Sequence, residues 1–217
     1  SKGRALQNMI NIQKGDKVCA FIHVKNLSDM EYVQNHYLIF ATKNGLMKKT
    51  TLESYSRPRA NGIIALGLRE DDRLIRVTLT DGNSQMLVAS YNGKVVRFPE
   101  DTVRPMGRTA TGVRAIKLDE DGKDRVIGMI CVEQGSKDSV LVISEKGFGK
   151  RTLLDDENGE PIYRITNRGG KGVKTMNITD KTGNLIGLEA VNDDMDLMLI
   201  TKAGTAIRMA MDAISVL

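Results

Sequence analysis

The feature that most constrains the fold of this 217-residue chain is a pattern that occurs four times. Each copy is an apolar run rich in Val, Ile and Leu, a short polar turn that ends on a glycine, and a second short run. The copies are YLIFATKNGLMKKT from Tyr37, QMLVASYNGKVVRF from Gln85, SVLVISEKGFGKRT from Ser139 and DLMLITKAGTAIRM from Asp196. Glycine supplies the positive φ that a tight hairpin turn needs. The pattern therefore predicts four β-hairpins, with turn glycines at Gly45, Gly93, Gly147 and Gly204.

A second repeated element alternates with the hairpins and begins with a basic loop of small residues. Each copy has a glycine before a strand of alternating character, at Gly3, Gly62, Gly112 and Gly172. A polar turn and another apolar strand follow, as in DDRLIRVTL from Asp71, DRVIGMICV from Asp124 and GNLIGLEAV from Gly183. One unit therefore spans about 50 to 60 residues with three or four strands, which fits a propeller blade better than a shorter solenoid rung.

Helical signals are almost absent, because no long window places apolar residues three, four and seven positions apart without an interrupting glycine or turn cluster. We expect an all-β, propeller-like disc of about four blades that belongs to a longer array, with residues 1–217 forming one repeat domain. No stretch approaches the roughly 18 consecutive apolar residues of a membrane span, and the beginning lacks the apolar core of a signal peptide. A soluble cytoplasmic protein is therefore expected.

Few residues have the chemistry of an active site. Cys19 and Cys131 lie far apart in apolar runs without a second ligand at metal-binding spacing, which predicts two buried, reduced thiols. His23 and His36 stand apart from any cysteine or nucleophile motif. The glycine-rich run NRGGKG at residues 167–172 lacks the spacing of a nucleotide-binding loop and precedes a strand. We expect no catalytic residue, no metal site and no cofactor in this chain.

Positive charge recurs at matched positions of the hairpins. A basic residue stands four positions after each turn glycine, at Lys49, Arg97, Arg151 and Arg208. One interpretation is a solvated strand face on which Lys and Arg protect an exposed edge. The other interpretation is one phosphate contact in each blade.

The loops that precede the second glycines gather further positive charge among Gly, Thr and Asn, which let the backbone approach a ligand. These loops hold Lys2, Arg4, Arg57, Arg59, Arg104, Arg108, Arg164, Arg168 and Lys171, and Lys174 follows the last glycine. Guanidinium groups and free N–H groups in such loops bind phosphate oxygens. Aromatic residues make up only 4% of the chain and Trp is absent, which disfavours stacking of single strands. The loops therefore predict a positive track for the backbone of duplex DNA, with strongly salt-dependent binding.

Several of these motifs resemble the C-terminal domain family of the DNA gyrase A protein, namely ATKNGLMKKT, RPRANGIIALGL, ASYNGKVVRF, VRPMGRTATGVRAIKL and EKGFGKRT. The resemblance covers essentially the whole chain. It implies a β-pinwheel, a disc of about six blades that exchange strands and wrap duplex DNA at the rim. It further implies a non-catalytic part of a bacterial topoisomerase that supports negative supercoiling. The implied partners are duplex DNA, the rest of gyrase A and the gyrase B protein, and no association with a membrane is implied. The catalytic tyrosine and the ATP and magnesium sites would lie outside this chain.

One departure from the family concerns its signature box, Gln-Arg-Arg-Gly-Gly-Lys-Gly, which family members carry near the first blade. No such box precedes Ser1, and the nearest match is the degenerate run at residues 167–172, whose Arg168 and Lys171 still suit phosphate. We therefore expect weaker DNA binding and bending than in a domain with the full box. Two alternatives stay open: the equivalent domain of topoisomerase IV, and a propeller that serves as a protein-interaction scaffold.

Overall fold

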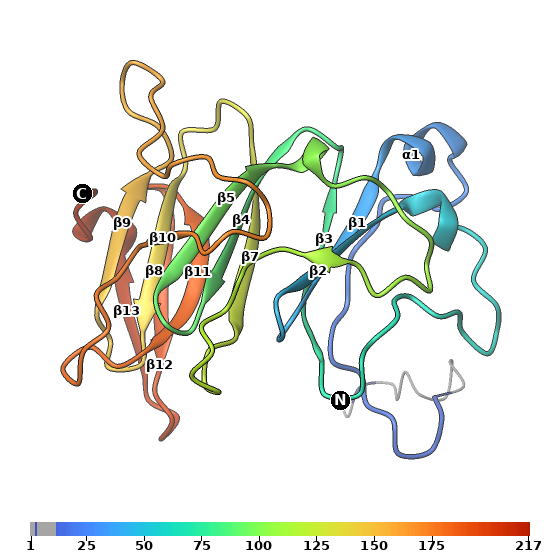
Figure 1. Cartoon of the computed structure of the whole chain (residues 1–217), viewed down its shortest axis with the longest axis horizontal. Coiled ribbons are helices and arrows are strands. Elements are labelled where there is room, and N and C mark those ends of the chain that lie inside the picture. Colours follow the sequence, from blue (N-terminus) through green and yellow to red (C-terminus); the bar gives the residue numbers. More distant parts are fainter. Residues whose placement is uncertain (1–2, 4–11) are drawn as a thin grey trace.

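The computed structural model describes Gly3 and residues 12–217. Four antiparallel β-sheets, which we call blades 1 to 4 in chain order, follow one another along the molecule (Figure 1). Two of the sheets have four strands, the third has three and the last has two. The all-β fold that the repeats predicted is confirmed.

Each blade is built on one of the predicted hairpins. The hairpin strands are β1 (Tyr37–Thr42) and β2 (Leu46–Thr51), β4 (Ser84–Ser90) and β5 (Lys94–Pro99), β8 (Ser139–Ser144) and β9 (Gly149–Leu153), and β12 (Asp196–Ile200) and β13 (Ala206–Ala210). The turn glycines Gly45, Gly93, Gly147 and Gly204 have φ of 87°, 82°, 81° and 86°. These values lie in the left-handed region that the turn pattern requires. In blades 1 to 3 a third strand pairs with the first strand of the hairpin: β3 (Leu74–Thr80), β7 (Val126–Glu133) and β11 (Leu185–Val191).

The fourth strand of blades 1 and 2 comes from the following repeat. β6 (Val113–Arg114) follows the blade 2 hairpin in sequence but pairs with β2 of blade 1. β10 (Val173–Lys174) follows the blade 3 hairpin but pairs with β5 of blade 2. Neighbouring blades therefore exchange strands, as the resemblance implied. The strands predicted after Gly112 and Gly172 are two residues long, and the one predicted after Gly62 is not formed.

Neighbouring blades pack face to face, so the hairpin strands of blade 2 are covered on both sides, whereas β13 of blade 4 is exposed. On β4, Met86 and Val88 belong to the core between blades 1 and 2, whereas Leu87 and Ala89 belong to the core between blades 2 and 3. Successive side chains of a strand point to opposite faces, so every residue of β4 is buried. β7 packs between β3 and β11, and β6 and β10 lie at the opposite, outer edge of their sheets.

Helical structure is sparse, as the sequence predicted. α1 (Met30–Asn35) precedes β1, and the Asp29 carboxylate caps it by accepting a hydrogen bond from the Tyr32 N–H. Single 3₁₀ turns follow three of the hairpins: η2 (Leu52–Tyr55), η3 (Glu100–Thr102) and η4 (Met211–Ala213). Within the part of the chain that the structure describes, no helix is long and apolar enough to cross a membrane.

The two cysteines differ in their surroundings. Cys131 is half-buried beside Met86, and burial raises the pKa of its thiol to about 12, so the thiol is protonated at neutral pH. Cys19 is exposed, so the prediction that both thiols are buried is wrong for this residue. The apolar run around Cys19 forms no strand; Ile22 and Val24 pack against the core of blade 1, but Cys19 lies outside that contact.

We expect Gly172→Ala to lower the free energy of unfolding by about 3 kcal/mol, because a side chain there meets both left-handed strain and a steric clash. Gly172 has a φ of 74°, and an added Cβ would lie 2.5 Å from the carbonyl oxygen of Val95 in the neighbouring blade. Gly159→Ala is the matched control, since Gly159 has a φ of 81° but open space around its Cα. Urea unfolding of both variants measures the difference. Equal losses of unfolding free energy in the two variants would contradict the close packing of Gly172 against Val95.

Candidate nucleic-acid interface

The basic loops of the sequence lie beside one another in the structure. We call them rim loop 1 (residues 57–68), rim loop 2 (residues 104–117, including β6) and rim loop 3 (residues 164–174, including β10), and together the basic rim. The two short strands β6 and β10 lie beside β2 and β5, each at the outer edge of its sheet. Rim loops 2 and 3 therefore follow the outer edges of blades 1 and 2.

Rim loops 1 and 2 are joined by main-chain and side-chain hydrogen bonds. The Gly67 N–H donates to the carbonyl oxygen of Ala110 at 3.0 Å. The guanidinium of Arg108 donates to the carbonyl oxygen of Ile64 at 3.1 Å. Arg108 thus has one hydrogen bond to the neighbouring loop and keeps its remaining donors for other partners.

Rim loops 2 and 3 are joined in a similar way. The Gly169 N–H donates to Ala115 O at 2.8 Å, and the Lys117 N–H donates to Gly170 O at 2.8 Å. The Arg168 guanidinium also donates to Arg114 O at 2.6 Å. The basic rim is therefore a continuous strip that crosses from one blade to the next.

Lys48 ties the first two rim loops to the sheet beneath them. Its side chain is fully buried, lies 5.1 Å from the centre of the Phe40 ring, and donates hydrogen bonds to the carbonyl oxygens of Ala65 and Arg108. Burial, and then the positive charge of Arg108, lower the pKa of Lys48 from 10.5 to about 8. Sequence reasoning missed this residue, because nothing in the KK pair distinguishes Lys48 from Lys49.

Most of the predicted rim residues are available to a ligand. The exposed ones are Arg57, Arg59, Arg104, Arg164, Lys171 and Lys174, and the half-buried ones are Arg108 and Arg168. Two further exposed residues of rim loop 2, Arg114 and Lys117, were not singled out from the sequence. Arg114 follows Gly112 by two positions, as Lys174 follows Gly172, so an alignment of the repeats would have identified Arg114 as a rim residue. Lys2 and Arg4 lie outside the described residues.

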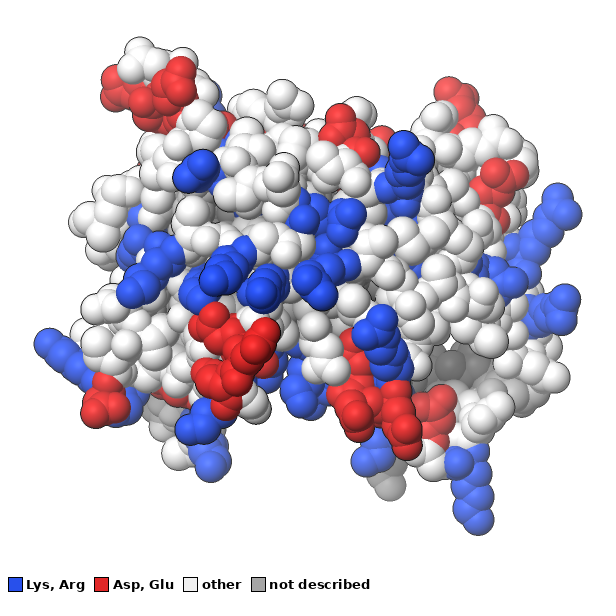
Figure 2. Space-filling view, viewed as in Figure 1, with Lys and Arg blue, Asp and Glu red and all other residues white. Residues whose placement is uncertain are grey.

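The rim side chains are not neutralised by carboxylates. Among residues 12–217, none of these Arg and Lys side chains forms an ion pair. Figure 2 shows Lys and Arg in a band across the middle of the face, with Asp and Glu mostly in separate clusters above and below it. The positive potential of the band is therefore directed to solvent.

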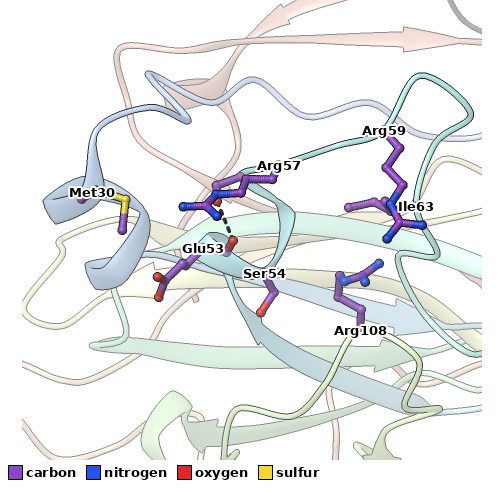
Figure 3. Close-up of a pocket in the computed structure, with 8 residues that line it drawn as sticks. Met30, Glu53, Ser54, Arg57, Arg59, Ile63 and Arg108 are labelled. Atoms are coloured by element: carbon purple, nitrogen blue, oxygen red, sulfur yellow. Dashed lines mark hydrogen bonds between the residues drawn. The ribbon is translucent and has the colours of Figure 1, made fainter.

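Two of the clefts on the basic rim gather several basic side chains. The first, of about 390 Å³, is lined by Arg57, Arg59 and Arg108 together with Ser54 and Ser56, and one carboxylate, Glu53, also lines it. In Figure 3 the guanidinium groups of Arg59 and Arg108 point toward each other. The second cleft, of about 800 Å³, is formed mainly by rim loop 3, with Arg164, Arg168, Lys171, Thr166 and Gly170 among its lining residues. Both clefts offer several donors to an anionic ligand.

The basic residues that follow the hairpin glycines lie elsewhere. Lys49, Arg97 and Arg151 are only 4%, 4% and 3% exposed, and each has protein partners. The prediction that they contact phosphate is therefore wrong, and so is the alternative of a solvated strand face. Both failed because the neighbouring blade covers this face of the hairpin. Arg208 of blade 4 is exposed and pairs with Asp196 of its own blade at 2.6 Å.

The lowered pKa of Lys48 predicts a pH dependence of stability. In the unfolded chain Lys48 keeps its proton up to about pH 10.5, whereas in the folded protein it loses the proton near pH 8. The unfolded state thus binds more protons between these values, so the contribution of Lys48 to stability rises with pH in that window. The free energy of unfolding of the wild type minus that of Lys48→Met should increase between about pH 7.5 and about pH 9.5. A pH-independent difference between the two proteins would contradict the assignment.

Comparison with known proteins gives the family. The family described as "DNA gyrase C-terminal domain, beta-propeller" matches residues 36–81, 85–133, 138–192 and 196–217, so each matched interval contains one hairpin. The DNA gyrase A protein of Staphylococcus aureus strain NCTC 8325 / PS 47 is 42% identical over 215 residues, which are 99% of this chain and 23% of that protein. The gyrase A protein of strain COL has the same identity and coverage. The chain therefore spans about a quarter of the length of these relatives.

Two solved structures share the fold. The C-terminal domain of DNA topoisomerase IV superimposes with a TM-score of 0.83 at 23% identity, over 99% of this chain and 63% of that one. The C-terminal domain of DNA gyrase A superimposes with a TM-score of 0.75 at 22% identity, over 97% of this chain and 66% of that one. The repeated blades, their strand exchange and the sequence match agree: this chain belongs to the DNA gyrase C-terminal domain family, which has a β-propeller fold.

Proposed function

We propose that this chain is a non-catalytic module that binds and wraps duplex DNA along its basic rim as part of a type II topoisomerase. The family to which it belongs supports a DNA-binding domain of such an enzyme. The observation that carries the proposal is the continuity of the three rim loops, each of which hydrogen-bonds to the next along the chain. Their exposed Arg and Lys side chains form one strip, not three separate patches.

A continuous strip suits the charge distribution of duplex DNA. The duplex carries one phosphate charge about every 1.7 Å along its axis, and each neutralised phosphate releases bound counterions. Bending a stiff duplex by 40–90° over 20–30 base pairs costs on the order of 1–6 kcal/mol, so many small contacts must act together. Because each repeat supplies basic side chains to the same strip, the number of contacts rises with the number of blades.

The rim favours contacts to the DNA backbone over recognition of base edges. Base readout in the major groove needs an inserted helix or β-ribbon. In the described part of the chain, the rim consists of loops and two-residue strands that follow the sheet edge. Arg and Lys on such loops reach phosphates without entering a groove, so we propose binding that is independent of DNA sequence.

The role in the whole enzyme follows from the relatives. We propose that the module acts beside the remainder of a gyrase A protein and with its gyrase B partner, and that wrapping supports negative supercoiling. The 42% identity to gyrase A of Staphylococcus aureus favours gyrase over topoisomerase IV, whose solved domain shows the shared fold alone. The catalytic residues would lie in the parts of the relatives that this chain does not span.

We expect duplex binding to weaken steeply with salt: the logarithm of the association constant should fall against the logarithm of the salt concentration with a slope of about −4 or steeper. Arg164→Ala with Lys171→Ala should lower the magnitude of that slope by about two and weaken binding equally for different sequences. Lys123→Ala with Lys202→Ala removes the same charge from exposed positions outside the rim and should leave the slope nearly unchanged. Fluorescence anisotropy with labelled linear duplex measures both pairs. A flat salt response of the wild type would sink the proposal.

We expect wrapping to change DNA topology. When nicked or relaxed circular DNA is closed by ligase with the protein bound, and the protein is then removed, the linking-number distribution should shift in one direction. The shift should grow with the ratio of protein to DNA and shrink for Arg57→Ala with Arg59→Ala. Agarose electrophoresis of the topoisomers records it. Binding without any shift would show that the rim contacts DNA but does not wrap it.

A further inference from the structure

The buried basic residue of blade 2 reaches into the next blade. Arg97 lies on β5, and its guanidinium donates to the carbonyl oxygens of Leu154 at 2.8 Å and Tyr163 at 3.1 Å, both in the segment that follows the blade 3 hairpin. It also forms an ion pair with Asp155 at 2.7 Å. The guanidinium of Arg97 therefore binds both ends of the loop at residues 154–163.

The main chain of Arg97 holds the same segment a second time. The Thr166 N–H donates to Arg97 O at 2.8 Å. Tyr163 and Thr166 flank Arg164, the first basic residue of rim loop 3. The side chain and the carbonyl of one buried residue thus fix the backbone on both sides of Arg164, immediately before Arg168 and Lys171.

The same arrangement recurs in blade 3. Arg151 on β9 donates to Met211 O at 2.9 Å and Ile214 O at 3.2 Å, and its own carbonyl accepts from the Leu217 N–H at 2.9 Å. It pairs with Asp193 at 2.8 Å. The segment that it holds, residues 211–217, contains no Arg or Lys. Within residues 1–217, Arg97 therefore holds a segment that carries basic side chains, whereas Arg151 holds one that carries none.

Blade 1 uses Lys49 in the same place. Its ammonium pairs with the buried carboxylate of Glu100 at 3.2 Å, and its carbonyl accepts from the Met106 N–H at 2.8 Å, beside Arg104. The identity of the cation differs from Arg97, but both hold the beginning of the next rim loop. A Lys is therefore tolerated at this position where a carboxylate faces it.

We propose that Arg97 is a positioning residue for DNA binding: it holds rim loop 3 so that Arg164, Arg168 and Lys171 face a common phosphate path, without itself contacting DNA. This inference rests on the proposed function of the basic rim. Arg97 satisfies two carbonyls and a carboxylate at once, so its removal leaves buried polar groups unpaired and releases the loop. Arg151 makes comparable contacts, but residues 211–217, which it holds, carry no Arg or Lys that could bind phosphate.

The test compares Arg97→Met with Arg151→Met in the 217-residue chain. Both variants should lose thermal stability, because each removes a buried guanidinium from between two blades. Only Arg97→Met should weaken duplex binding, by about tenfold near 0.1 M salt, and it should lower the magnitude of the salt slope by about two to three, as expected when a whole loop is lost. Arg97→Lys should recover at least half of the salt slope that Arg97→Met loses, since Lys49 is the cation at the equivalent position of blade 1. When Arg97→Met is combined with Arg164→Ala and Lys171→Ala, DNA affinity should fall little below that of the double variant, because the three changes act on the same loop.

Amide hydrogen exchange without DNA separates this inference from the proposed function. Residues 163–170 should exchange faster in Arg97→Met than in the wild type or in Arg151→Met. If exchange changes in this way but the wild type shows no salt-dependent binding, the proposed function fails while the loop-holding contact stands. Unchanged exchange in Arg97→Met, or equal losses of DNA binding in both Met variants, would overturn the positioning role.

Discussion

The pairing of β6 with β2 and of β10 with β5 is the constraint on which the rest of the structure depends. Each pairing sends the chain back to the preceding blade, so the segment before it must run along the outer edge of the sheets. That segment is the basic loop of the repeat. Gly112 and Gly172 allow the crossing because their positive φ and missing side chain let them lie against Met47 O and Val95 O. Strand exchange and the placement of positive charge therefore have one origin.

Two kinds of basic residue emerge from the same repeat, and burial separates them. Arg164 and Lys171 face solvent, where a cation keeps its hydration until a phosphate replaces it. Arg97 and Arg151 are enclosed between blades, where a cation is tolerated only because carbonyls and a carboxylate satisfy its donors. The first kind suits ligand binding and the second kind suits holding blades together. A surface that must stay continuous over several blades needs both.

The family match and the structural matches carry different information. The relatives from Staphylococcus aureus are 42% identical over 99% of this chain, so the match includes both the blades and the segments between them. The topoisomerase IV domain superimposes better than the gyrase A domain, yet both are below 25% identity and show the fold alone. The blade fold is thus shared by chains that differ in more than three quarters of their residues, which is expected when backbone hydrogen bonds and apolar packing define the fold.

The sequence by itself determined the repeated hairpins, the left-handed glycines at their turns and the recurrence of charge, because these depend on local backbone conformation and on spacing along the chain. It did not determine which charges are outside. In β5 the residues Val95, Val96, Arg97 and Phe98 are all buried, since neighbouring blades cover both faces of the strand and alternation no longer distinguishes inside from outside. The position of Lys48 beneath two rim loops and the exposure of Cys19 were likewise decided by contacts between distant segments. Only the tertiary structure decided these points, because burial is a property of packed neighbours.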